Sequence, residues 1–368
     1  MTVDGNNTDN DEHIDPYSSN LDLDILIVGA GFSGIYFLYQ LRKKGYNVKI
    51  FESANGLGGT WKVNHYPGAR VDSSIPIYEF SLPEIWKGWN WKERYPGWKE
   101  LQEYFEYCDT ILDIKKDVSF NTKVIEAHFE KDEGKWIIKT DDGRISKAKY
   151  FLPCIGFAAK EYVPDFPGLE TFKGEIHHSS NWPESEVDVA GKRCAVIGTG
   201  STGVQIIQEW AKKAESLVLS SEDQKKDKYP EIFHHRLIGV GGMAFEHIPR
   251  NTFDDTEEER EKVFEELWKS GDFKFWVANK VHYDFWAKKV RAMITDPRKR
   301  DILAPLEPPH PFGTKRPSLF VDYYEQLNKP NVEVVSVKNN PIIEVKPEGI
   351  VTADGKIYEI DVLALATG

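Results

Sequence analysis

Two glycine-rich turns carry the clearest chemical meaning in this chain. Gly29-Ala30-Gly31-Phe32-Ser33-Gly34 follows the apolar run 25–28, and Gly198-Thr199-Gly200-Ser201-Thr202-Gly203 follows the run 194–197. In the pattern Gly-x-Gly-x-x-Gly, the first glycine permits a tight turn. The second lets the backbone approach a pyrophosphate, and the third lets a helix pack on a strand. The helix N-terminus then offers free N–H groups to the phosphates. Two such turns predict two dinucleotide sites, an arrangement that suits electron transfer from a nicotinamide to a flavin.

Charged residues near the ends of the following strands bear on which nucleotides bind. Glu52 closes the strand predicted at 48–52, where an acid typically binds ribose hydroxyls. The corresponding strand of the second turn, at 216–221, ends in serines followed by acids. An adenosine 2′-phosphate needs a cation, and Lys225 and Lys226 are the nearest positive charges. The sequence therefore leaves NADPH and NADH open.

The elements that must position these residues follow an α/β pattern with two Rossmann-like domains. A strand at 24–28, a helix to about 44 and a strand at 48–52 form a βαβ unit around the first turn. A second such unit begins at Arg193. Apolar spacing also predicts a helix at 101–112, antiparallel strands within 122–153, a mostly helical insertion at about 225–309 with a helix beginning near Thr256, and strands at 332–335, 349–351 and 361–368.

Length, composition and charge restrict the class of protein. A chain of 368 residues has room for two domains. The net charge of −12 argues against a nucleic-acid or anionic-membrane partner. No apolar run reaches about 18 residues, so no membrane span is expected. The three cysteines form no C-x-x-C pair and predict buried thiols in a reducing compartment, hence a cytoplasmic protein. No metal site is expected.

Tryptophans and further motifs extend the chemistry. The tryptophans between 86 and 98 fit either a core or the wall of a flat cofactor site. Gly58-Gly59-Thr60-Trp61 is followed after four residues by Tyr66-Pro67-Gly68, and then by Asp72. A fourth pattern consists of Phe172, Gly174, His178, Trp182 and Pro183.

With these motifs the chain resembles the class B flavin monooxygenases, specifically the Baeyer–Villiger monooxygenase family. The resemblance covers about 24–368. Related N- and S-oxidising enzymes usually carry Tyr or Phe and then Lys at the end of the fourth pattern, so Trp182-Pro183 favours the Baeyer–Villiger branch. The resemblance implies FAD, NADPH, O2 and a ketone. FAD reduced by NADPH reacts with O2 to a C4a-peroxyflavin, which converts the ketone to an ester or lactone.

The resemblance also implies roles for individual residues. Arg316 reaches over the flavin and stabilises developing negative charge, Asp72 holds its guanidinium, and Lys315 helps bind the 2′-phosphate. Phe172, Gly174, His178 and Trp182 belong to the interdomain linker, which His178 is thought to orient. The candidate cofactor-binding residues are Gly29, Gly31, Phe32, Ser33, Gly34, Glu52, Gly59, Thr60, Trp61, Tyr66, Asp72, Tyr78, Val124, Gly198, Thr199, Gly200, Ser201, Thr202, Gly203, Lys315 and Arg316.

The domain prediction follows from these assignments. Residues 1–20 are expected to form a disordered acidic tail, and 21–160 the FAD-binding domain. About 340–368 and a missing C-terminal part would complete that domain, because members of the family continue past the Ala366-Thr367-Gly368 turn. Residues 161–339 are expected to form the NADP-binding domain, interrupted by the helical insertion.

Two departures and three alternatives remain. The family usually has an arginine near the end of the second domain's second strand, and 220–222 holds none. The missing C-terminal part would also contribute a substrate loop. The alternatives are a heteroatom-oxidising flavin monooxygenase, a truncated inactive nucleotide-binding form, and a flavin–disulfide reductase. The last is disfavoured because no redox cysteine pair exists near the first domain.

Overall fold

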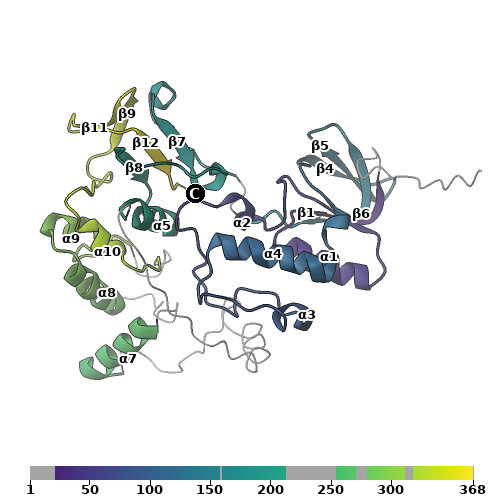
Figure 1. Cartoon of the computed structure of the whole chain (residues 1–368), viewed down its shortest axis with the longest axis horizontal. Helices are drawn as coiled ribbons and strands as arrows, with labels where there is room; N and C mark the ends of the chain where they lie inside the picture. Colours follow the sequence, from purple (N-terminus) through teal and green to yellow (C-terminus); the bar gives the residue numbers. More distant parts are fainter. Residues whose placement is uncertain (1–20, 158–159, 213–253, 271–279, 311–317, 368) are drawn as a thin grey trace, which may run out of the picture. The chain divides into compact units, whose positions relative to one another are not determined.

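The computed structural model describes residues 21–157, 160–212, 254–270, 280–310 and 318–367. The chain divides into two compact units (Figure 1). The first unit consists of Met1–Gly59 and Phe105–Phe157, and the second of Thr60–Tyr104 and Ala158–Gly368. The predicted tail at 1–20, the strand at 216–221 and much of the predicted insertion lie outside the described residues.

The first unit is built on one six-stranded mixed sheet in the order β3-β2-β1-β6-β5-β4. Its first four strands run parallel, and β5 and β4 extend the sheet antiparallel to β6. The strands are β1 (Asp22–Val28), β2 (Val48–Phe51), β3 (Val118–Ser119), β4 (Val124–Glu130), β5 (Lys135–Thr140) and β6 (Ile145–Pro153). The predictions of strands at 24–28 and 48–52 and of antiparallel strands within 122–153 are confirmed.

Apolar side chains of these strands form the core of the first unit. Leu26 and Ile138 are fully buried, in a cluster with other residues of β1, β2, β5 and β6. Helix α1 (Phe32–Lys43) follows β1, and the short 3-10 helix η1 (Lys115–Asp117) precedes β3. Helix α4 (Trp98–Leu112) contains the boundary between the two units. The predicted helices to about 44 and at 101–112 are therefore confirmed.

The second unit contains two three-stranded sheets, in the orders β7-β12-β8 and β11-β10-β9. The first is parallel and carries the second glycine turn; the second is antiparallel. Their strands are β7 (Glu175–His178), β8 (Cys194–Ile197), β9 (Ile342–Lys346), β10 (Gly349–Thr352), β11 (Ile357–Glu359) and β12 (Val362–Leu365). β12 is buried along its whole length because it lies between the other two strands of its sheet.

Two expectations for this region differ from the structure. The sequence analysis assigned about 340–368 to the FAD-binding domain, but β12 pairs with β7 and β8 in the sheet of the second glycine turn. A strand was also expected at 332–335, and these residues form none. Val332 and Val334 instead pack against a helical cluster. A short apolar run does not specify whether it pairs as a strand or packs on helices.

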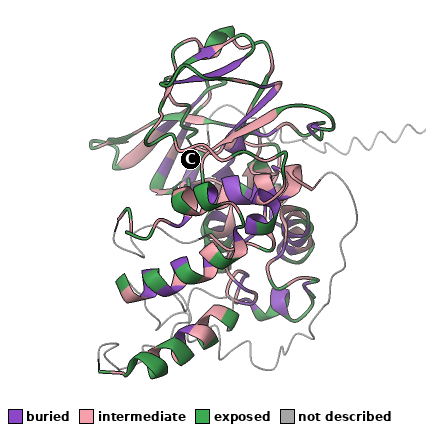
Figure 2. Ribbon diagram, turned by 90° about the vertical axis from the view of Figure 1, so that its left-hand side faces the viewer, coloured by how far each residue is buried: buried purple, intermediate pink, exposed green. Residues whose placement is uncertain are grey.

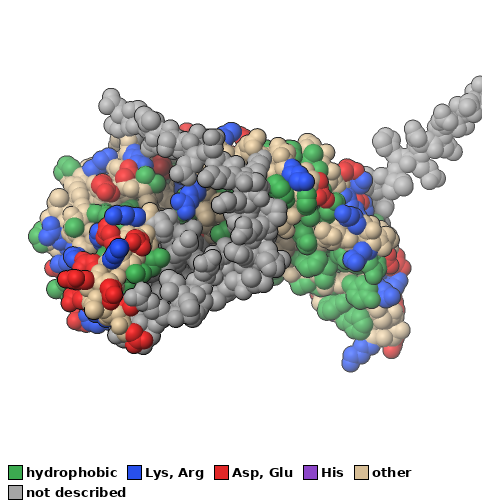
Figure 3. All heavy atoms as spheres, turned by 90° about the horizontal axis from the view of Figure 1, so that it is seen from below, with side chains coloured by type: hydrophobic (Ala, Val, Ile, Leu, Met, Phe, Trp, Pro, Cys, Tyr) green, Lys and Arg blue, Asp and Glu red, His purple; other side chains and the backbone are tan. Residues whose placement is uncertain are grey.

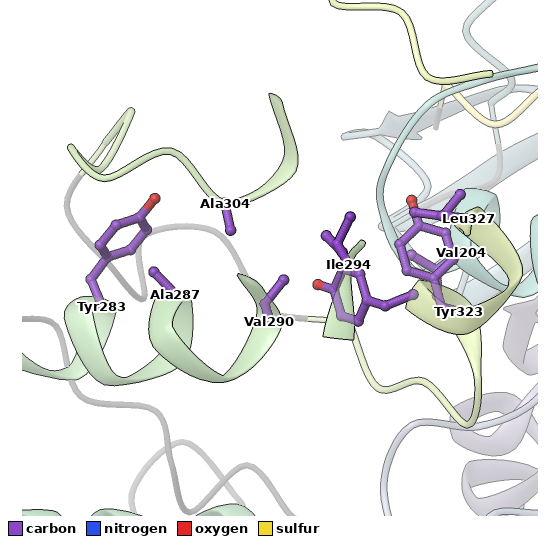
Figure 4. Close-up of a cluster of buried hydrophobic side chains, with 9 residues drawn as sticks. Val204, Tyr283, Ala287, Val290, Ile294, Ala304, Tyr323 and Leu327 are labelled. Atoms are coloured by element: carbon purple, nitrogen blue, oxygen red, sulfur yellow. The ribbon is translucent and has the colours of Figure 1, made fainter. Parts of the chain in front are cut away.

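Helices make up much of the remainder of the second unit. Val204 of α5 belongs to a buried cluster with side chains of the neighbouring helices; Tyr323 lies beside it, and Tyr283 lies at the other end of the cluster (Figure 4). α8 buries one face and exposes the other (Figure 2). The helices are α2 (Thr60–Val63), α3 (Pro83–Trp86), α5 (Ser201–Trp210), α7 (Glu257–Ser270), α8 (Lys280–Met293), α9 (Pro297–Leu303) and α10 (Tyr323–Leu327), with 3-10 turns η2 (Leu169–Thr171) and η3 (Ser179–Asn181).

The helix expected to begin near Thr256 does so with a capping box. The Glu259 backbone N–H donates to Thr256 Oγ1 at 3.3 Å, and the Thr256 N–H donates to Glu259 Oε2 at 2.9 Å. Each residue thus satisfies a free donor of the other at the start of α7. This confirms the predicted helix start.

Charged side chains of both signs lie intermixed on the face of the second unit that Figure 3 shows at the left. Lys288 pairs with Glu261 at 2.5 Å and Lys289 with Glu265 at 2.5 Å, which joins α7 to α8. Among the described residues, no helix combines the length and apolar character needed to cross a bilayer.

An exposed ion pair at the starts of β8 and β12 gives a pH prediction. The Arg193 side chain donates to Asp361 at 2.7 and 3.1 Å, and its backbone N–H donates at 2.9 Å. These bonds lower the pKa of Asp361 to about 2. The unfolded carboxyl binds its proton near pH 4, so the pair's contribution to stability is present above about pH 4 and is lost as the pH falls through about 2.

Asp361→Asn is therefore expected to flatten the fall in stability between about pH 4 and pH 2. The effect is small because the pair is exposed. Urea unfolding midpoints of both proteins across this pH range test the expectation. Equal slopes for the variant and the parent chain would contradict it.

Candidate nucleotide-binding sites

Two positions of the first glycine turn have no room for a side chain. Gly29 has φ +101°, and a Cβ there would lie 2.5 Å from the Cys154 carbonyl oxygen. A Cβ on Gly34 would lie 1.9 Å from the Gly29 oxygen. These contacts let β1 turn sharply into α1, whose cap residue is Gly31.

The Gly58-Gly59 pair folds back onto this turn within the first unit. The Gly58 N–H donates to the Ala30 oxygen at 3.0 Å. Gly59 has φ +55°, and a Cβ on it would lie 3.0 Å from the Gly31 Cα. The two motifs, both of which hold candidate cofactor-binding residues, are thus in backbone contact at the start of α1.

Glu52 organises the same turn. Its side chain is buried, and Oε2 accepts from the Ala30 N–H at 2.6 Å while Oε1 accepts from the Ala54 N–H at 2.7 Å. An ionised carboxylate has about four acceptor positions, so two backbone bonds leave capacity for ribose hydroxyls. The structure therefore gives Glu52 a structural role beside the predicted binding role.

Glu52→Gln is expected to lower the free energy of unfolding by about 1–3 kcal/mol even without a nucleotide. One amide oxygen cannot serve both N–H donors, and the amide NH2 group would face one of them. Chemical denaturation measures the change. Glu126→Gln, which breaks an exposed pair with Lys139 at 3.0 Å, is the control and should change the free energy of unfolding much less. Similar decreases in the free energy of unfolding in the two variants would contradict a structural role for Glu52.

Other predicted residues of the first unit lie around this turn or in the sheet. The Phe32 ring packs edge-on against Phe105 at 4.8 Å between centroids. Ser33 is exposed in the first turn of α1. Val124, the first residue of β4, packs against the sheet core.

The second glycine turn repeats this geometry in the second unit. Gly198 has φ +123°, and a Cβ there would lie 2.2 Å from the Ala366 oxygen. A Cβ on Gly203 would lie 2.1 Å from the Gly198 oxygen. Gly200 caps α5, and a Cβ on it would meet no described atom within 4 Å. Thr199 and Gly200 are exposed, so this turn presents open backbone at a helix N-terminus.

Residues 60–78 of the second unit hold several further candidates. Trp61 lies in α2, which begins at Thr60, and its Nε1 donates to Tyr78 Oη at 2.9 Å. Arg70 pairs with Glu93 at 3.1 Å. Asp72 is half-buried and close enough to Tyr66 for its charge to act on that phenol.

Tyr66 connects this segment to α5. Its hydroxyl donates to Gln205 Oε1 at 3.0 Å, and its oxygen lies 3.3 Å from Thr202 Oγ1. Burial raises the pKa of Tyr66, the Thr202 hydrogen bond opposes that shift, and the charge of Asp72 adds to it. Tyr66 therefore stays a protonated donor. A Cβ on Gly68 would lie 2.7 Å from the Gln205 backbone oxygen, so glycine is needed where this segment crosses α5.

The fourth motif lies around β7. A Cβ on Gly174 would lie 2.3 Å from the Asp361 oxygen, and Trp182 is buried in a cluster with Tyr66. Phe172 packs against a second cluster, which includes Leu363 and Leu365 of β12. These contacts give all three a packing role.

His178 of this motif is buried and bonded at both ring nitrogens. Nδ1 lies 2.8 Å from Ser180 Oγ, and Nε2 lies 3.2 Å from the Tyr162 oxygen and 3.4 Å from Thr367 Oγ1. It joins the chain near 162 to the turn that follows β12. The role at the linker remains a prediction that these contacts support.

Some predictions fall elsewhere. Lys315, Arg316, Lys225 and Lys226 lie outside the described residues. In the tryptophan group, Trp86 and Trp91 are buried; Trp91 donates to Glu79 at 3.0 Å, which favours the core interpretation for it. A separate cavity of about 540 Å³ in the second unit is lined by Trp98, Trp182 and Trp210, among others, and by neither glycine turn.

The sequence analysis missed Gln205 and Gln208. Both are buried on α5, and Gln208 Oε1 accepts from the backbone N–H groups of Val321 at 2.8 Å and Asp322 at 3.2 Å. Their signal was present in the sequence: together with Ser201 they occupy positions i, i+4 and i+7, where a packed helix normally carries apolar residues.

Two glycine turns, each at the carboxyl end of a parallel strand and the start of a helix, define a protein with two nucleotide-binding folds. A family model described as flavin-binding monooxygenase-like matches residues 23–264. The chain belongs to this flavin-binding monooxygenase-like family.

Named relatives share most of the chain. It is 46% identical to the FAD-binding monooxygenase acrE of Aspergillus aculeatus, over 96% of this chain and 64% of that protein. It is 41% identical to the cyclopentanone 1,2-monooxygenase of Comamonas sp., over 95% of this chain and 69% of that protein. The chain thus spans about two-thirds of the length of these curated relatives.

Solved structures agree with the fold. The crystal structure of cyclohexanone monooxygenase from Rhodococcus sp. Phi1 bound to NADP+ superposes with a TM-score of 0.88 at 35% identity. The match covers 95% of this chain and 71% of that one. The α/β class with two Rossmann-like folds is therefore confirmed.

Proposed function

We propose that this chain binds FAD at the glycine turn of the first unit and NADPH at that of the second. The observation that carries the proposal is the form of the two turns. Among the described residues, neither α1 nor α5 has a side-chain cap, and neither has an acid in its first turn. Both therefore suit a pyrophosphate, whose negative charge a helix N-terminus favours. Glu52 would hold the ribose of FAD.

We further propose a Baeyer–Villiger oxygenation, in which O2 and NADPH convert a ketone to an ester or lactone. FAD, when bound, would supply the redox and oxygen-activating chemistry. Arg316 would stabilise the negative charge that develops as oxygen adds to the ketone, and Asp72 would orient its guanidinium by a charge-assisted hydrogen bond. Relatives named for cyclopentanone and acetone oxygenation support a ketone as the substrate class.

Coenzyme and location belong to the same proposal. NADP+ in related crystal structures supports NADPH over NADH, with Lys315 as the residue that contacts the 2′-phosphate. The cysteines at 108, 154 and 194, which form no disulfide within the described residues, and a strongly acidic composition are compatible with a cytoplasmic protein. Heteroatom oxidation is the second candidate, because the family shares its nucleotide folds with N- and S-oxidising enzymes.

The test is a side-by-side assay of the purified chain with NADPH, O2 and either cyclopentanone or a thioether. Lactone from the ketone, with NADPH consumed in proportion, is the expected result. Sulfoxide without lactone would replace the ketone reaction with heteroatom oxidation. NADPH oxidation that yields only H2O2 with both substrates would remove the oxygenation step.

A further inference from the structure

Helix α5 carries a polar stripe on a buried face. Ser201, Gln205 and Gln208 lie at positions i, i+4 and i+7, which places them on one side of the helix. Gln205 is 5% and Gln208 7% exposed. Buried amides require hydrogen-bond partners, so the partners indicate what the stripe does.

The partners of Gln205 lie in the segment that leads to Asp72. Gln205 Oε1 accepts from Tyr66 Oη at 3.0 Å, and Nε2 donates to the Arg70 backbone oxygen at 3.1 Å. The backbone of Gly68 crosses the same residue in close contact. The far side of the segment is also fixed, because the Val71 N–H donates to the Pro96 oxygen at 3.1 Å. Gln205 thus holds the backbone two residues before Asp72.

The partners of Gln208 and Ser201 lie in the chain that follows Arg316 in sequence. Gln208 Oε1 accepts from the Val321 and Asp322 N–H groups, and Ser201 Oγ lies 3.4 Å from Ser318 Oγ. Ser318 follows Arg316 by two positions. Through its polar stripe, helix α5 therefore anchors two segments. One ends at the candidate residue Asp72, and the other follows the candidate residue Arg316 in the sequence.

We propose that Gln205 and Gln208 are positioning residues that fix residues 66–72, which end at Asp72, and residues 318–322 relative to the helix whose N-terminus receives NADPH. This inference rests on the proposed function, since it assigns these glutamines a part in that reaction. Their bonds go mainly to the backbone, so they set where each segment lies whatever its other side chains are. Neither glutamine is expected to touch a nucleotide or substrate.

The experiment compares Gln205→Leu and Gln208→Leu with the parent chain and with a matched control. Leucine keeps the approximate volume and removes the hydrogen bonds. The control is Asn328→Leu, which removes a half-buried amide that accepts from the Thr295 N–H at 2.9 Å and donates to the Met293 oxygen at 2.8 Å; neither bond goes to residues 66–72 or 318–322.

Amide hydrogen exchange of the full chain, without nucleotide, reports positioning directly. Gln205→Leu should speed exchange in residues 66–72 by about 5- to 30-fold, and Gln208→Leu should do so in residues 318–322, because each loses about one or two net hydrogen bonds. Asn328→Leu should leave both segments unchanged. If a folded glutamine variant exchanges the amides of its targeted segment at the same rate as the parent chain, the proposal is overturned.

The share of O2 that ends in ester rather than in H2O2 shows whether the glutamines position groups for the reaction or only stabilise the fold. In both glutamine variants the share of O2 that ends in ester should fall at least about 5-fold with H2O2 rising to match, while the KM for NADPH stays within about 2-fold. A parental ester share despite faster exchange would overturn the role in the reaction. If the parent chain itself forms no ester, the proposed function fails, and the exchange data still decide whether the glutamines fix these segments.

Discussion

Arg316→Ala is expected to retain FAD and to lose ester formation by about 10²–10³-fold. A fixed cation that meets developing negative charge in a water-poor site typically contributes this much to the rate. Arginine suits the role because it stays charged at neutral pH and presents a rigid fork of donors. Flavin content by absorbance and ester by chromatography measure the two halves of the expectation.

Two further variants sharpen this test. Arg316→Lys keeps the charge but loses the planar fork, and should recover only part of the rate. Arg298→Ala removes an exposed arginine 3.7 Å from Glu333 and should leave the rate unchanged. Ester formation by Arg316→Ala at the rate of the Arg298 control would refute the assignment.

Replacing the middle glycine of each turn by alanine is expected to impair one nucleotide site and leave the other intact. Gly31 and Gly200 have φ −85° and −74°, which alanine adopts without strain. A Cβ on Gly31 would make only an ordinary 3.5 Å contact, with Gly59 Cα. Each added methyl would clash with the pyrophosphate rather than with the protein. It should therefore lower the affinity for that nucleotide by about 10- to 100-fold.

The two alanine variants serve as controls for each other. Gly31→Ala should have a lower affinity for FAD and an unchanged affinity for NADP+. Gly200→Ala should have an unchanged affinity for FAD and a lower affinity for NADP+. Equilibrium titration of each folded variant with each nucleotide gives four affinities. Loss of both nucleotides in one variant, at unchanged thermal stability, would contradict independent turns.

The local features of the fold followed from the sequence because short-range patterns determine them. The runs before each glycine turn, the helix start at Thr256 and the antiparallel strands within 122–153 depend on residues close together in the sequence. The glycines at 29 and 198 were predicted from the turn that each permits, and the structure gives both a positive φ.

Long-range pairing was harder to predict. β12 reads as a buried strand, but nothing within it says that it lies between β7 and β8 rather than in the first sheet. The contact of Tyr66 and Gly68 with α5 joins residues well over a hundred positions apart, so spacing could not reveal it. Gln205 and Gln208 share a helical spacing with Ser201, but the spacing does not say whether that side of the helix is buried or which segments it contacts.

The measurement that tests the central claim most directly follows the flavin spectrum of the purified chain, first without O2 and then with it. The account predicts a yellow protein that NADPH bleaches without O2 and that regains its colour when O2 and cyclopentanone are admitted, with lactone as the product. A chain that binds no flavin, or one whose bound flavin NADPH does not reduce, would contradict the claim that its two glycine turns serve one electron-transfer reaction.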